Sequence, residues 1–323
     1  MIELYITHGE TVYQPILEGN ITWETERYGA PGKLTFSVVN DNYTYTTQMR
    51  LNIQEGDPVV LRIDGKNIFF GFVFIKSRDK DQVIKITAYD QLRYLKNKDT
   101  YILEDWTATK LVESIAADFY LQTGELEDTK YPLNVTFDGD TLFDMITYAL
   151  QETNRFTGEL YVLYDDYSKL ALKNINSMRL DYLLTEQTAE NFSYETSIDG
   201  ETYNQIKLIY DNEETGYRDV YLTKDSENIQ QWGLLQYYDS LNEKENGIMK
   251  AETLLNMYNS KRRTLTVSGA FSDLRVRGGV LIPVMLTLGD VDAKSYLLVE
   301  KATHTITEKE RTMNLTLRGG YFV

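Results

Sequence analysis

The chain has 323 residues, a formal net charge of −16 and no cysteine. A chain of this length exceeds one ordinary core of about 100 to 200 residues, so two or three domains are expected. The lack of cysteine excludes disulfides, thiolate metal sites and cysteine nucleophiles, and the acidic balance disfavours tight binding of nucleic acid or anionic lipid.

The composition also bears on structure and location. The 25 tyrosines against 5 prolines favour a β-rich chain, because aromatic residues suit pleated surfaces and proline interrupts them. No stretch approaches the roughly 18 to 20 apolar residues of a membrane span, and MIELYITHGE lacks the basic and apolar regions of a signal peptide. We therefore expect a soluble protein, synthesised in the cytoplasm, with no membrane anchor.

Residues 1–99 have the alternating pattern of short β-strands and predict a first sheet domain. The run VVLRIDGKNIFFGFVFI places Asp64 and Gly65 between two apolar segments. Asp-Gly at this position is a strong hairpin signal, because a type I′ turn needs a positive φ at both central residues. Short strands at this spacing are typical of a β-barrel or sandwich.

The stretch KITAYDQLRYLKNKDTY ends this first domain. A strand runs through Asp90 into Leu92 and Leu95, which are three positions apart. One helical turn would place both leucines on the same side, against the end of the barrel. We interpret the stretch as the closing corner of a barrel.

Residues 100–198 change to a helical period and predict an α+β module. Apolar residues follow helical spacing in WTATKLVESIAADFY and again in DTLFDMITYAL. Thr141 stands three residues before Asp144, which is a capping signal. The segment ELYVLYDDYSKLALKNI then predicts a hairpin that turns near Asp165 and Asp166.

Residues 199–323 return to strands and predict a second barrel domain. A helix near residues 241–260 is inserted in it, with a capping signal at Ser240 and Glu243. The final strands can be laid over the first domain, GDPVVLRIDGK to DQVIKITA against GGVLIPVMLTLG to RTMNLTLRG. The common order of glycine, apolar strand, turn, apolar strand and alternating strand predicts an internal duplication.

Residue types that carry chemistry are few. His8 and His304 are the only histidines, and His304 in ATHTIT is interpreted as a half-buried structural residue. The sequence contains no HExxH, no GxSxG with a partner pattern and no phosphate-binding GxxxxGK[ST]. The arginines of SKRRTLTV and RVRGG are assigned to helix capping or surface ion pairs. No catalytic, cofactor-binding or metal site is predicted.

Two segments carry a family likeness. KITAYDQLRYLKNKDTYI resembles the N-terminal barrel ending of the XkdQ/YqbQ-like tail proteins of phages and defective prophages. The C-terminal third resembles the wider late-control and baseplate-hub pattern, with I-x-x-[YW]-G, a helix, G-x-x-[IV]-x-V and V-x-x-x-x-H-x-[IF]. One departure is Gly278-Gly279 where the family has Gly-Asp. The positions assigned to the signature, all structural, are Asp64, Gly65, Asp90, Leu92, Leu95, Gly233, Ala251 and His304.

The resemblance implies an α+β fold that is mainly β, with two tail-tube-like antiparallel β-barrel domains and an intervening α+β module. It implies a non-enzymatic baseplate hub of a phage tail or of a phage-tail-like contractile particle such as a tailocin. A homotrimer with two barrels per chain would form a pseudo-sixfold ring that joins the tail tube to the central spike. The implied partners are tube, spike and other baseplate proteins, with DNA only as passing cargo.

Two alternatives remain open from the sequence. A peptidoglycan hydrolase could use a carboxylate pair such as Asp138 and Asp140, although both residues stand where turns and helix caps favour Asp. A carbohydrate-binding module could use exposed aromatics, for which YETSIDGETY is a candidate loop.

Overall fold

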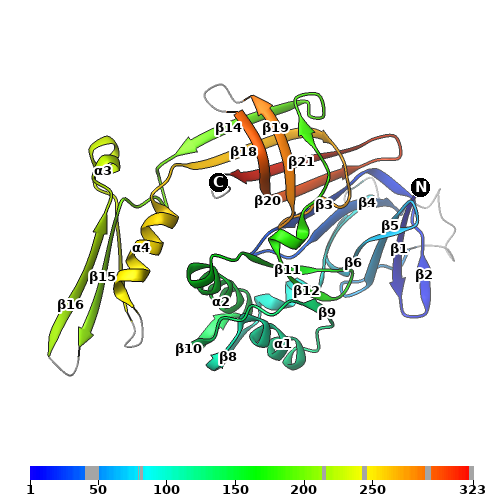
Figure 1. Ribbon diagram of the computed structural model, residues 1–323. Helices are drawn as coiled ribbons and strands as arrows, with labels where there is room; N and C mark the ends of the chain where they lie inside the picture. The colour runs from blue at the N-terminus through cyan, green and yellow to red at the C-terminus, as the bar shows by residue number, and fades with distance from the viewer. Residues whose placement is uncertain are drawn as a thin grey trace.

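The computed structural model is mainly β and carries helices in two places (Figure 1). Within the described ranges, no helix is both long and apolar enough to cross a membrane. The structure describes residues 1–40, 51–78, 80, 83–212, 216–241, 246–287 and 292–319.

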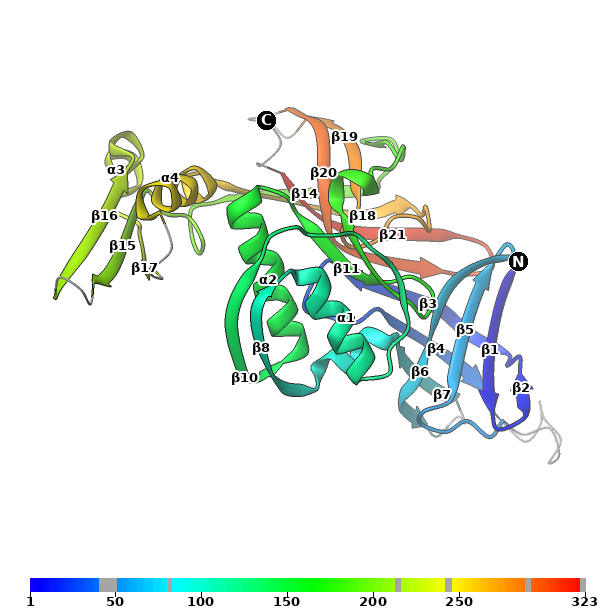
Figure 2. The ribbon, with the colours of Figure 1, turned by 60° about the horizontal axis from the view of Figure 1, so that its bottom comes forward.

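The first unit is a curved antiparallel sheet in the order β3-β4-β7-β6-β5-β1-β2 (Figure 2). Its apolar residues alternate inward, and Leu34, Phe36 and Ile86 are almost fully buried. The predicted hairpin is confirmed, because Asp64 and Gly65 join β5 to β6 with φ of 51° and 77°. The strands are β1 (Ile2–His8), β2 (Thr11–Tyr13), β3 (Leu17–Glu26), β4 (Lys33–Val39), β5 (Pro58–Ile63), β6 (Lys66–Arg78) and β7 (Val83–Tyr89).

The second unit repeats this order as β14-β18-β21-β20-β19-β13. In this order β14, β18, β21, β20 and β19 take the places of β3, β4, β7, β6 and β5. β13 takes the place of β1 but runs parallel to its neighbour, whereas β1 runs antiparallel. The common order is what the predicted duplication requires. The strands are β13 (Leu184–Thr185), β14 (Asn191–Ser197), β18 (Arg262–Phe271), β19 (Leu281–Thr287), β20 (Asp292–Ile306) and β21 (Arg311–Gly319).

The two units form one continuous sheet, because β20 pairs with β3. Among the described strands, neither unit closes on itself, since the edge strand of the first unit pairs with the second unit instead. The boundary expected at residue 199 falls after β13 and β14, although both strands pair within the second unit. Phe192 and Tyr194 of β14 pack against that unit's core, so the strand belongs to the second unit.

The α+β module lies beside the first unit and below the second (Figure 1). Its two predicted helices are confirmed: Thr107 caps the first, and the Thr141 hydroxyl accepts from the Asp144 N–H at 3.1 Å to cap the second. The elements are a 3₁₀ helix (Gln91–Lys96), β8 (Lys98–Trp106), α1 (Ala108–Asp118), β9 (Thr123–Leu126), β10 (Leu133–Thr141), α2 (Leu142–Thr157), β11 (Tyr161–Asp165), β12 (Leu170–Asn174) and a second 3₁₀ helix (Ile175–Met178).

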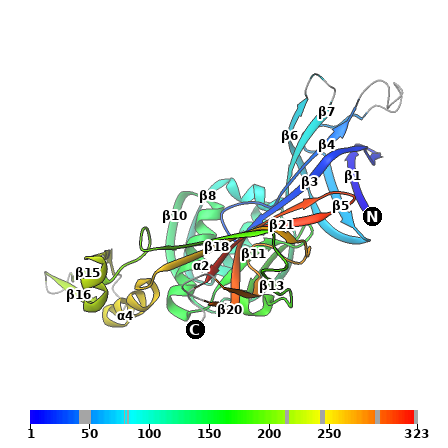
Figure 3. The ribbon, with the colours of Figure 1, turned by 90° about the horizontal axis from the view of Figure 1, so that it is seen from above.

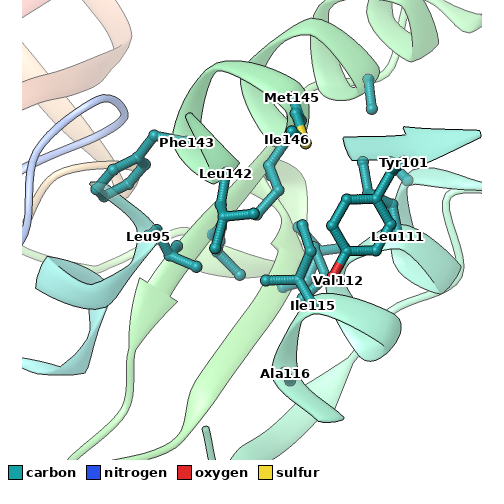
Figure 4. Packing of buried hydrophobic residues seen from close by; sticks show 14 of the residues in the cluster. Leu95, Tyr101, Leu111, Val112, Ile115, Ala116, Leu142, Phe143, Met145 and Ile146 are labelled. Carbon is teal, nitrogen blue, oxygen red and sulfur yellow. The ribbon is translucent and has the colours of Figure 1, made fainter. Parts of the chain in front are cut away.

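The leucines of the predicted barrel corner pack elsewhere. Leu92 and Leu95 do form one turn, and the Asp90 carboxylate caps it by accepting from the Leu92 N–H at 3.0 Å. However, both leucines belong to the core of the α+β module, where Leu95 lies beside Leu142 and Phe143 of α2 (Figure 4). The prediction that they pack against the end of the barrel is therefore wrong, because both side chains lie in the core of the module and not in that of the first sheet.

A separate lobe projects from the body between β14 and β18 (Figure 1). A three-stranded sheet in the order β16-β15-β17 packs one face on α4, where Ala251 is buried. The predicted helix start at Ser240 is wrong, since Ser240 ends β17 and Asn246 caps α4; Glu243 lies outside the described residues. The elements are β15 (Gln205–Asn212), β16 (Tyr217–Lys224), α3 (Ser226–Trp232), β17 (Gln236–Ser240) and α4 (Gly247–Tyr258).

The position of Leu95 gives a stability prediction. Leu95→Ala empties a site with no exposed surface and should lower the free energy of unfolding of the module by about 2 to 5 kcal/mol. Hydrogen exchange followed by mass spectrometry should show faster exchange in α1 and α2 and unchanged exchange in the lobe.

Leu183→Ala is the matched control, because Leu183 is 45% exposed and its truncation should cost well under about 1 kcal/mol. Faster exchange of the first sheet with unchanged α1 and α2 would contradict the packing of Leu95 in the module.

Candidate assembly interface

The joint between the two units is the pairing of β3 with the second half of β20. Six residue pairs form it, from Ile21 opposite Ile306 to Glu26 opposite Lys301. Its centre is Trp23 opposite His304, whose rings stack at 5.1 Å between centroids. The joint therefore has a continuous backbone ladder and a buried aromatic centre.

His304 is fully buried and bonded at both ring nitrogens. Nε2 lies 2.7 Å from the carbonyl of Val276, which only accepts, so Nε2 carries the hydrogen and donates. Nδ1 lies 2.7 Å from the Ser272 hydroxyl and accepts from it in the neutral ring. Burial lowers the pKa of His304, although the Val276 carbonyl opposes the shift. The structure thus gives this residue a packing and bonding role.

Ion pairs line one side of the joint. Lys301 Nζ lies 3.0 Å from Glu24 and 2.9 Å from Glu26, and Arg27 Nε donates to Glu300 at 2.7 Å. Burial opposes ionisation of Glu24, but hydrogen bonds from Lys33 and Lys301 outweigh it and lower the pKa of that carboxyl. The side chains therefore fix the register that the backbone ladder alone would leave open.

A second contact, which we call the charge node, brings together one residue from each part of the body. It consists of Arg277 of the second unit, Asp90 at the end of the first unit and Asp165 of the module. Arg277 Nη1 donates to the Asp165 carbonyl at 2.9 Å, and its guanidinium lies 4.2 Å from the ring centroid of Tyr164. Asp90 accepts from the Gly32 N–H at 2.9 Å, and a Cβ on Gly32 would collide with it.

Burial shapes the charges of this node. It raises the pKa of Asp90 and that of Asp165, the latter to about 6, while the nearby Arg277 opposes both shifts. Burial also lowers the pKa of Arg277. The Nε atom of Arg277 and the Oδ2 atom of Asp165 are enclosed without a hydrogen-bond partner among the described residues. Removal of Arg277 would therefore leave two buried carboxyls with no compensating charge.

An aromatic face docks the module on the outside of the first unit. Phe70, Phe72 and Phe74 alternate along β6 with their rings on the same side. Phe70 meets Tyr167 of the β11–β12 turn, while Phe72 and Phe74 both meet Tyr94 of the 3₁₀ helix. Edge-to-face contacts of this kind add about 0.5 to 1.5 kcal/mol per pair beyond the buried area.

The signature residues predicted from sequence are spread along these contacts. Asp90 belongs to the charge node, and His304 reaches the same loop through Val276, the neighbour of Arg277. Asp64 accepts from Arg311 of β21 at 2.7 Å and so links the first hairpin turn to the second unit. Gly233 ends α3 with a φ of 79°, far from the joint in the lobe. The sequence assigned Asp165 to a turn and Arg277 to capping or a surface ion pair and did not predict their burial together, because an arginine in a loop and an aspartate at a turn are usually exposed.

The residues of the two alternative functions show no built site. Asp138 and Asp140 are exposed on β10, and Asp138 accepts from the Thr100 hydroxyl at 3.1 Å. Tyr194 packs in the core of the second unit, and Tyr203 packs on Tyr237 and Tyr258 in the lobe. Among the described residues, no group of three or more His, Asp or Glu side chains is arranged to hold a metal ion.

Comparison with known proteins agrees with the duplicated sheet. The YQBQ-like family model matches residues 21–318, which includes the module, the lobe, nearly all of the second unit and the first unit without β1, β2 and the start of β3. The chain belongs to the YQBQ-like family. Two relatives from Bacillus subtilis strain 168, YqbQ and the phage-like element PBSX protein XkdQ, are each 27% identical over 98% of this chain and 96% of their own length.

Solved structures of tail proteins share the fold of this YQBQ-like chain. The 43 kDa tail protein of prophage MuSo2 from Shewanella oneidensis matches with a TM-score of 0.70 at 14% identity, over 98% of both chains. The tail protein of Neisseria meningitidis MC58 matches with a TM-score of 0.70 at 12% identity, over 98% of this chain and 96% of that one. The predicted family and the mainly β fold class are therefore confirmed.

The charge node predicts a contrast between two neighbouring arginines. Arg277→Gln should lower the free energy of unfolding by about 3 kcal/mol, because it leaves Asp90 and Asp165 uncompensated. Arg275→Gln removes only exposed pairs with Asp181 and Asp273 and should cost less than about 1 kcal/mol. Urea unfolding of both variants measures the difference, and equal costs would contradict the node.

His304 predicts a pH dependence. Because the folded-state pKa is lowered, the unfolded chain takes up the proton first as pH falls below about 6.5, so stability should decline by up to about 1.4 kcal/mol per pH unit. His304→Gln should lose stability at neutral pH and show a flatter decline between about pH 7 and pH 5. His8→Gln, which removes the other histidine, should keep the decline. An unchanged slope in His304→Gln would show that the imidazole is not held neutral.

Proposed function

We propose that this chain is a structural, non-enzymatic baseplate hub of a phage tail or of a phage-tail-like contractile particle. In the assembled particle three copies form a ring with pseudo-sixfold symmetry, which joins the tail tube to the central spike. Tube, spike and other baseplate proteins are its partners, and DNA passes through only as cargo where the particle carries a genome.

One observation carries the proposal: a single chain holds two sheet units with the same strand order, joined edge to edge. A head-to-tail contact between equivalent units closes into a ring when its rotation divides a full turn. Three chains with two units each present six equivalent faces to a sixfold tube and three identical ends to a threefold spike. A chain with one unit could match only one of these symmetries.

The residues support a division of labour along the chain. The two units make the ring wall, and the module, at about residues 91–178, packs on the outside of the first unit through Tyr94 and Tyr167. The lobe at about residues 203–260 projects away from both units, where it can reach a neighbouring protein (Figure 1). The relative XkdQ is a protein of the phage-like element PBSX, which agrees with this setting.

Native mass spectrometry of the purified chain tests the proposal, alone and mixed with tube and spike proteins produced from the same prophage. The single chain has a mass of 37.5 kDa, and a species of three times that mass should grow with concentration or on addition of the spike. A chain that stays at 37.5 kDa with both partners present would contradict the proposal.

A further inference from the structure

The two units repeat each other residue by residue in their edge strands. β3 contains NITWETE and β14 contains NFSYETS, which match in type at every position except the last. The two strands also hold the same place: Trp23 lies opposite Leu34 of β4, and Tyr194 lies opposite Leu265 of β18. Trp23 and Tyr194 are therefore equivalent positions, and so are Glu24 and Glu195.

β6 and β20 are equivalent in the same sense. The first half of each strand pairs with the strand before it, and the second half pairs with the strand after it. A register shift interrupts the second pairing at the same point, between Val73 and Ile75 in β6 and between Val299 and Lys301 in β20. Residues 75–78 of β6 thus correspond to residues 301–304 of β20.

The equivalent strands differ in one respect. Residues 301–306 of β20 pair with β3 along their outer edge, whereas no described strand pairs with the outer edge of residues 75–78. β14, the equivalent of β3, likewise ends the sheet with one edge unpaired among the described strands. Edge strands present rows of unpaired N–H and C=O groups that favour pairing with another chain. Each chain therefore contains one complete joint, between β3 and β20, and the two equivalent strand edges, on β14 and β6, from which a second joint could form.

We propose that β14 of one copy pairs with the second half of β6 of the next copy, and so repeats the β3–β20 joint between chains. The inference rests on the proposed trimeric hub and names the edges that close it. The register of the internal joint transfers directly: Tyr194 lies opposite Arg78 of the next copy, Glu195 opposite Ser77 and Thr196 opposite Lys76. Three such contacts alternate with three internal joints around the ring.

The side chains of the two edges can meet across the proposed contact. Successive side chains of a strand point to opposite faces, so in this register Lys76 and Arg78 share a face with Thr196 and Tyr194, while Glu195 shares the other face with Ser77. Arg78 would face the ring of Tyr194 in a cation–π contact, at the place where His304 stacks on Trp23. The Tyr194 hydroxyl is buried and has no hydrogen-bond partner among the described residues, so the edge offers Arg78 the ring of Tyr194 rather than its hydroxyl.

The shape of the molecule agrees with this contact. Figure 3 shows the ends of β6 and β7 extending beyond the rest of the molecule, where a neighbouring strand can reach them. β14 lies on the opposite end of the strand order from the first unit. β14 and the second half of β6 therefore do not pair with each other within one chain, and β14 of one copy can pair with β6 of the next in a head-to-tail contact.

The cysteine-free sequence makes the register testable by crosslinking. The double variant Ser77→Cys/Glu195→Cys places one thiol on each edge, at positions predicted to be opposite each other between copies. Oxidation of the assembled protein should move the chain on a non-reducing gel from 37.5 kDa to three times that mass. The control Ser77→Cys/Tyr217→Cys keeps the first thiol and moves the second to the lobe, where Tyr217 is 77% exposed. It should stay at the single-chain mass.

Each outcome separates the two proposals. A crosslinked trimer supports both the edges and the ring. A trimer in native mass spectrometry with no crosslink in Ser77→Cys/Glu195→Cys overturns the proposed edges and leaves the hub intact. A ladder of crosslinked species without an end point supports the edges and overturns the trimeric ring. A chain that neither associates nor crosslinks with tube and spike proteins present overturns both.

Discussion

The pairing of β20 with β3 is the contact on which the rest of the structure depends. A ladder of backbone hydrogen bonds turns two sheets into one, and the stacked rings of Trp23 and His304 hold its centre. The imidazole is bonded to Ser272 and Val276 and cannot turn without losing a buried hydrogen bond. The angle between the two units is therefore fixed within the chain, and a ring built from such chains inherits it.

The charge node extends this rigidity to the module. Arg277 follows the residue that holds His304 and lies among carboxyls from two other parts of the chain, so the joint and the module are coupled through adjacent residues. Buried charges of this kind stabilise little by themselves, but they strongly disfavour any arrangement that separates them. The node therefore favours the observed placement of the module. An aromatic face on β6 supplies the apolar area of the same contact.

Most of the secondary structure could be predicted from the sequence, whereas few of the contacts between the two units and the module could. Alternation along the strands, the Asp64-Gly65 turn and the two capped helices of the module are local signals, and the structure confirms them. The final strands alone indicate the duplication, yet the predicted boundary at residue 199 assigns β14 to the module, because its partner β18 lies across the whole lobe in sequence. For Leu92 and Leu95 the predicted helical turn is confirmed, but the predicted packing partner is wrong. Periodicity indicates which face of a turn is apolar, and it does not indicate which part of the chain covers that face. The assignment of the RVRGG arginines to helix capping or surface ion pairs is wrong for Arg277, because burial of an arginine depends on contacts from distant segments that the local sequence does not reveal.

We propose that two equivalent units per chain allow three chains to form six positions around one ring. A cryo-electron microscopy reconstruction of the tail end of the assembled particle tests this directly. The account predicts three copies of the chain in one ring between tube and spike, with both units of each copy facing the same lumen at related positions. A ring with six copies of the chain, or copies placed around the outside of the tube, would contradict it.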